Sequence, residues 1–97
     1  MKTVTIIGRR WFDKINGNTY FSAVGLIDNE EKAIIDYEYG YGNHYEHRIF
    51  DELENSGIIT NREHHNNGSK EMPWRYCEKH NIKYYSTVSD VSRKKDL

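Results

Sequence analysis

The chain contains a single cysteine, Cys77, among 97 residues and no long hydrophobic run. One cysteine excludes an intramolecular disulfide, so a reducing compartment is the simplest setting. No stretch approaches the roughly twenty consecutive apolar residues of a membrane-spanning helix, and the first residues lead directly into a strand pattern. We therefore predict a cytoplasmic protein without a membrane partner.

An excess of charge of either sign is also lacking, because 14 basic and 15 acidic side chains give a net charge of −1. No overall field is present to hold nucleic acid or an anionic membrane. The charges are unevenly distributed, however, and residues 28–54 carry two basic and nine acidic side chains. This acidic segment is either a solvated face or a surface complementary to a basic partner.

Aliphatic residues are few, whereas the chain has 8 Tyr against 3 Phe and 2 Trp. A core built on such rings keeps polar groups at its margin. The length is typical of one domain, residues 1–97. Sparse apolar residues indicate a domain with a large solvated surface or one that is completed by self-association, and we expect a homo-oligomer.

The N-terminal stretch, residues 3–28, predicts a β-hairpin. Two runs rich in β-branched and aromatic residues flank Asn16 and Gly17, and Asn-Gly between such runs is a strong hairpin signal. Residues 32–41 predict a third strand. Its alternation places the following side chains on one face: Ala33, Ile35, Tyr37, Tyr39 and Tyr41.

Two helices and a last strand are predicted after this meander. Tyr45, Ile49 and Leu53 fall on one stripe of a helix over residues 44–55, with Asn43 and Glu46 spaced as a capping box. Residues 60–70 predict an exposed loop. Pro73 suits the first turn of a shorter helix with Trp74 and Cys77 on its inner side, and alternation resumes from residue 82.

The resulting order, β-β-β-α-α-β, predicts an α+β fold with helices on one face of a mainly antiparallel sheet. It comprises a three-stranded antiparallel meander, two helices and a final strand.

Four short segments carry a resemblance to a known group of proteins. They are Gly8-Arg9-Arg10-Trp11-Phe12, Gly17-Asn18-Thr19-Tyr20, Tyr39-Gly40-Tyr41-Gly42 and the closing Arg93-Lys94-Lys95-Asp96-Leu97. With these motifs the chain resembles short, mostly uncharacterised proteins encoded by bacteriophages, over nearly its whole length. The resemblance implies an accessory factor or an inhibitor of host defence, and none of the motifs is catalytic.

The sequence contains no group of residues whose spacing clearly indicates a metal site or a catalytic site. His44 and His47 share one helical face, and Cys77 and His80 repeat that spacing on the second helix. Nothing in the sequence brings these pairs together, and His64-His65 lies in the loop without spaced partners. No local signature surrounds Cys77 as a nucleophile. We predict no enzymatic activity, no metal and no cofactor.

A nucleotide site is one alternative that remains open. Gly40 and Gly42 lead into the helix expected to begin after Asn43, where backbone N–H groups and the helix dipole favour an anion. Tyr39 and Tyr41 could stack on a base, and Arg9 or Arg10 could pair with phosphate. Such a protein would sequester a signalling nucleotide.

Nucleic-acid binding is a second alternative. If the first and last strands are neighbours, their basic residues could form one stripe with Trp11 and Tyr85 interleaved. The stripe would comprise Arg9, Arg10, Lys14, Lys83, Arg93, Lys94 and Lys95.

Protein binding is the leading hypothesis. The acidic segment could occupy a basic groove on a partner, and Trp and Tyr are the residues that anchor interfaces. Together with the resemblance, this predicts an inhibitor that binds a host defence protein in the host cytoplasm, for example one that itself binds nucleic acid. The expected partner-binding residues are Asp36, Glu38, Asp51, Glu52 and Trp11.

Overall fold

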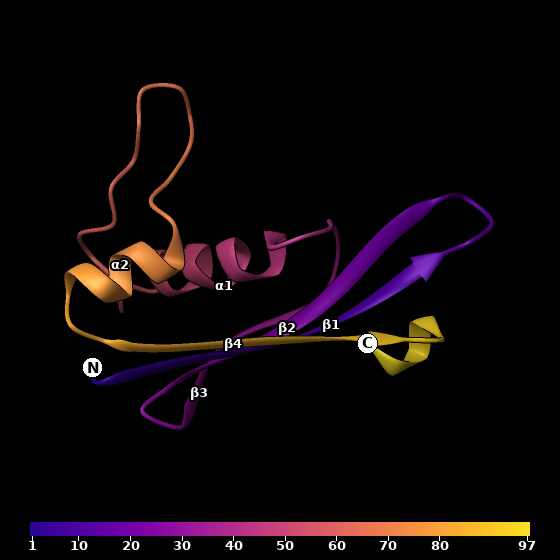
Figure 1. Ribbon diagram of the computed structural model, residues 1–97, viewed down its shortest axis with the longest axis horizontal. Coiled ribbons are helices and arrows are strands. Elements are labelled where there is room, and N and C mark those ends of the chain that lie inside the picture. Colours follow the sequence, from indigo (N-terminus) through magenta and orange to yellow (C-terminus); the bar gives the residue numbers. More distant parts are fainter.

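The computed structural model describes residues 1–97 and contains four strands, two α-helices and one short 3-10 helix (Figure 1). In chain order they are β1 (Thr3–Asp13), β2 (Asn18–Ile27), β3 (Glu30–Tyr39), α1 (His44–Asn55), α2 (Pro73–Lys79), β4 (Lys83–Val91) and η1 (Lys94–Asp96). The predicted order of strands and helices is confirmed.

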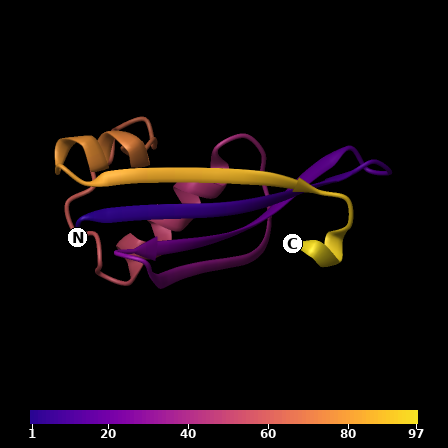
Figure 2. The same cartoon turned by 60° about the horizontal axis from the view of Figure 1, so that its bottom comes forward.

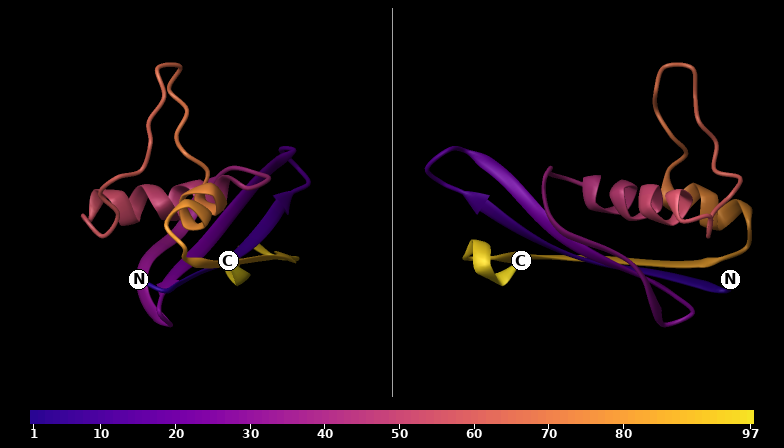
Figure 3. Two further views of the ribbon diagram at one scale, coloured as in Figure 1. Left: turned by 60° about the vertical axis from the view of Figure 1, so that its left-hand side comes forward. Right: turned by 180° about the vertical axis from the view of Figure 1, so that it is seen from behind.

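The strands form one sheet in the order β3-β2-β1-β4 (Figure 2). β1, β2 and β3 make the predicted antiparallel meander, and β4 pairs with β1 in parallel. Both helices pack on one side of this sheet, as Figure 3 shows. The α+β fold with helices on one face is thus confirmed, and β3 and β4 are the two edges.

Helix α1 lies close to the sheet because two glycines face it. A Cβ atom on Gly8 would lie 2.7 Å from the Tyr45 ring, and one on Gly25 would lie 2.5 Å from Cγ2 of Ile49. The predicted stripe of α1 is buried at Tyr45, Ile49, Phe50 and Leu53. The absence of a side chain at Gly8 and Gly25 therefore allows α1 to pack directly against the backbone of the sheet.

The end of β3 departs from the predicted alternation. Phe21 pairs with Glu38 and Ala23 pairs with Ile35, so β3 has one residue more than β2 between these pairs. This β-bulge reverses the faces beyond Ile35, because side chains alternate with a period of two. Tyr37 and Tyr39 consequently lie on the side away from the helices, and the single tyrosine face predicted for this strand is wrong.

The segment between the helices projects from the helix side of the sheet (Figure 1). It is the predicted loop, with one bridge between His64 and Lys70. The second helix does begin at Pro73. Its predicted inner face is only partly right, since Cys77 is buried but Trp74 is 51% exposed, and Tyr76 takes the inner position.

Candidate functional site

The side of the sheet away from the helices, which we call the open face, is rich in uncovered apolar side chains. Ile7, Ile34 and Tyr85 are 44%, 51% and 55% exposed. The strand registers bring the following residues to this face: Ile7, Arg9, Trp11, Tyr20, Val24, Leu26, Ile34, Tyr37, Tyr39 and Tyr85.

A hollow of about 410 Å³ lies in the open face. Aliphatic side chains of three strands form most of its lining, and Arg9 and Asp36 also line it. The chain end after η1 contributes Leu97 to the wall. The hollow therefore combines an apolar surface with one basic side chain, Arg9, and two acidic ones, Glu31 and Asp36.

Beside the hollow, Trp11, Tyr20 and Tyr37 form an aromatic ladder across β1, β2 and β3. The ring centroids of Trp11 and Tyr20 are 5.9 Å apart, and the two ring planes differ by 25°. The ring centroids of Tyr20 and Tyr37 are 5.0 Å apart, and their planes differ by 12°. Tyr39 meets Tyr20 edge to face, and Nζ of Lys94 lies 4.9 Å from the centre of the Tyr37 ring. Both faces of Tyr20 are thus covered within the ladder.

The acidic residues expected to bind a partner are mostly engaged inside the molecule. Arg48 of α1 donates from Nε and Nη2 to the two carboxylate oxygens of Glu38, each at 2.7 Å. The same guanidinium contacts Asp51 at 3.4 Å and Glu52 at 3.3 Å. These three carboxylates are partly exposed but form ion pairs within the chain, and Asp36 alone of the four lies exposed without an ion pair.

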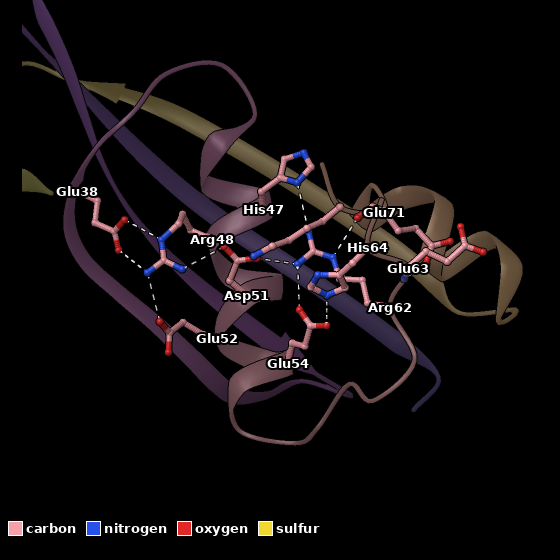
Figure 4. A network of polar contacts seen from close by, with 11 residues as sticks. Glu38, His47, Arg48, Asp51, Glu52, Glu54, Arg62, Glu63, His64 and Glu71 are labelled. Atoms are coloured by element: carbon pink, nitrogen blue, oxygen red, sulfur yellow. Dashed lines mark hydrogen bonds and ion pairs between the residues drawn. The ribbon is translucent and has the colours of Figure 1, made fainter. Parts of the chain in front are cut away.

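A buried arginine, Arg62, joins this cluster to the projecting loop (Figure 4). Its Nη1 donates to Oδ1 of Asp51 at 2.7 Å, and its Nε donates to the carbonyl of Glu71 at 3.1 Å. Burial raises the pKa of Asp51, but hydrogen bonds from Arg62 and Lys70 outweigh that effect and leave the pKa below its usual value. The network fixes the loop to α1.

The residues predicted for a nucleotide site are not gathered in one place. Arg9 lines the hollow on the open face, whereas α1 and its N-terminus lie on the other side of the sheet. Arg10 bonds Asp90 at 3.2 Å. Gly40 is buried against His44 and Phe21, while Tyr41 is exposed at the surface.

The predicted capping box is also wrong. Neither side chain caps α1, and Glu46 instead accepts hydrogen bonds from the hydroxyls of Tyr84 and Ser86 at 2.9 and 2.8 Å. At the start of α1, Gly42 has a φ of +66°. The only hydrogen bond between Asn43 and Glu46 there is a backbone one, in which the N–H of Glu46 donates to the carbonyl of Asn43. Glu46 therefore ties α1 to β4.

The histidines and Cys77 do not assemble a reactive set. No group of three or more His, Cys, Asp and Glu side chains has the geometry to hold a metal ion. Burial raises the pKa of the Cys77 thiol to about 12, which keeps the thiol protonated near neutral pH. His47 contacts Arg62, and His64 contacts Glu54.

The basic stripe predicted for nucleic-acid binding requires that the first and last strands are neighbours, and they are, but the basic side chains do not form a continuous surface. β1 and β4 are neighbours, as the hypothesis required. Arg10 nevertheless pairs with Asp90 and Arg93 pairs with Asp96, while Arg9 lies on the opposite face from Arg10. Acidic partners therefore interrupt the stripe.

Sequence reasoning missed Arg62, the hollow and the ladder. An arginine in a polar loop gives no local sign of burial, and the bulge that turns Tyr37 toward Tyr20 has no marker such as glycine. Trp11 and Asp36 are the two predicted partner-binding residues that belong to the open face.

Comparison of the chain with protein-family models, with curated proteins and with solved structures found no match. Neither α-helix has the length and apolar character needed to cross a membrane.

Proposed function

We propose that this chain is a non-enzymatic binding protein that attaches to a host protein through the open face of its sheet. The observation that carries the proposal is the exposure of Ile7, Ile34 and Tyr85 on a sheet face that neither α-helix covers. Large contiguous apolar patches on soluble proteins commonly mark interaction sites.

The chemistry of the face supports a protein as the partner. The hollow can accept an apolar side chain as an anchor, while Arg9 and Asp36 offer one charge of each sign for orientation. Tyr39 and Tyr85, each more than half exposed, add rigid contact area and a hydroxyl.

The ladder argues against nucleic acid as the main ligand. Base stacking requires a free ring face. In the ladder, Trp11 and Tyr37 flank the ring of Tyr20, and Lys94 lies over Tyr37. The ring of Tyr20 is therefore not free to stack on a base, which favours a folded protein over nucleic acid as the ligand.

The resemblance to bacteriophage proteins supports a host defence factor as the class of partner. Inhibition would follow if the open face occupied a working surface of that factor. The acidic cluster around Arg48 would then stabilise the scaffold, and Asp36 would be the acidic side chain left for the partner.

Quantitative capture from host lysate tests the proposal with two matched variants. Ile34 on the open face and Trp74 on α2 are both 51% exposed. We expect Ile34→Asp to lose the protein that the wild type captures, and Trp74→Asp to retain it. Retention by Ile34→Asp, or loss in Trp74→Asp alone, would contradict the proposal.

A further inference from the structure

Strand β4 leaves one edge of the sheet unpaired. It is the last strand in the order β3-β2-β1-β4 and runs without a register shift from Lys83 to Val91 (Figure 2). None of the backbone hydrogen bonds made outside helices and strands involves residues 84–90. This edge therefore presents free backbone donors and acceptors.

The direction of these groups follows from the pairing with β1. The N–H of Lys83 donates to the carbonyl of Lys2, at the start of the parallel ladder. Because alternate residues of a strand direct their backbone groups to opposite sides, the odd-numbered residues of β4 bond to β1. Tyr84, Ser86 and Val88 direct theirs away from the sheet.

The two edges of the sheet differ in protection. β3 has two register shifts and the charged residues Glu30, Glu31, Lys32, Asp36 and Glu38. Bulges and charges of this kind prevent a further strand from pairing. Between Lys83 and Asp90, β4 has no charged residue, no proline and no bulge. Only the β4 edge is open to strand addition.

We propose that the β4 edge pairs with β4 of a second copy of this chain, antiparallel across a two-fold axis at Ser86. This interface is separate from the open face and does not rest on the proposed function. Antiparallel pairing of like strands closes into a symmetric dimer, in which the two four-stranded sheets become continuous.

The side chains of β4 are complementary to themselves in this register. Tyr85 stands opposite Thr87 on the open face, and Tyr84 stands opposite Val88 on the helix face. Aromatic residues opposite β-branched residues are favourable cross-strand pairs. Lys83 stands opposite Ser89, so no like charges meet. Tyr84 and Val88 are partly buried beside the core, and the partner strand would cover them further.

A register with the axis at Thr87 fits less well. It would place Tyr84 opposite Asp90 and Tyr85 opposite Ser89, and both aromatic pairs would be lost. The side chain of Ser86 bonds Tyr45 and Glu46 on the helix side, so it does not obstruct pairing at the preferred axis.

Light scattering over a concentration series gives the first test. We expect the mass of two chains for the wild type and for Ile34→Asp, which alters the open face. Val88→Pro removes an outward N–H and should give the mass of one chain, with the sheet signal in circular dichroism retained. A wild-type monomer at all concentrations, or a dimer lost in Ile34→Asp and kept in Val88→Pro, would overturn the proposal.

Disulfide trapping tests the register independently of any folding defect. Cys77 is fully buried, so any disulfide between chains must form through the introduced cysteines. An equimolar mixture of Tyr85→Cys and Thr87→Cys chains should give a mixed disulfide dimer on mild oxidation, at least tenfold above either variant alone. Equal trapping within Thr87→Cys alone, or no trapping in the mixture, would overturn the assignment.

Discussion

Arg62 determines how the projecting loop is held, although it lies in the polar stretch of residues 60–70. Its buried guanidinium bonds Asp51 on α1 and the carbonyl of Glu71, and it lies 5.7 Å from the centre of the Phe50 ring. A buried charge is tolerated only when its donors are satisfied. The loop thus gains a fixed position from one side chain, at a site that composition alone assigns to solvent.

Burial, together with this arginine, makes the stability of the protein sensitive to protonation of His47. Burial and the neighbouring Arg62 lower the pKa of His47, while Asp51 and Glu46 act in the opposite direction without reversing the shift. Unfolded histidine has a pKa of about 6.5. The unfolded chain therefore takes up this proton at higher pH than the folded chain.

We predict that the free energy of unfolding decreases as the pH falls below about 6.5, since the unfolded state then binds more protons. Urea denaturation at a series of pH values measures this. His47→Gln should flatten the profile, because Gln does not titrate. His65→Gln is the matched control, since His65 is exposed and makes no side-chain hydrogen bond. Parallel profiles for wild type and His47→Gln would contradict the assignment.

At the scale of elements, the close approach of α1 to the sheet depends on Gly25. We predict that Gly25→Ala lowers the free energy of unfolding by about 1–3 kcal/mol, because the added methyl would overlap Cγ2 of Ile49. The matched test is the double variant with Ile49→Ala. It should cost less than the sum of the single variants, because the truncated side chain makes room. Additive losses in chemical denaturation would show that the overlap is relieved in another way.

The elements themselves were largely predictable from the sequence. The hairpin, the extent of α1 and the start of α2 at Pro73 follow from the Asn-Gly turn, the apolar stripe and the preference of proline for a first helical turn. The position of Trp74 and the direction of Tyr37 did not follow. The first depends on which side of a two-turn helix meets the core, and the second on a bulge set by pairing with β2.

The candidate site was predictable only in part, for the same reason. Trp11 was identified because aromatic anchors are recognisable from residue type. The helical spacing of Arg48 with Asp51 and Glu52 is visible in the sequence, but the strongest contact of Arg48, with Glu38 on β3, is not. Contacts between distant segments decide whether a charge is available.

At the scale of the whole molecule, the two sides of the sheet differ in composition and in burial. The helix side holds the buried core and the ion pairs of Arg48 and Arg62. The open side has the hollow and the ladder, with apolar side chains that remain exposed. Our central claim is that this open side is where a host protein binds.

Photo-crosslinking tests that claim most directly, because it needs no loss of folding or binding. Benzoylphenylalanine is placed at position 34 on the open face or at position 74 on α2, and the chains are irradiated in host cells. We predict a covalent adduct with one host protein from position 34, reduced by excess unmodified chain, and no such adduct from position 74. Adducts from position 74 alone, or from neither position, would contradict binding through the open face.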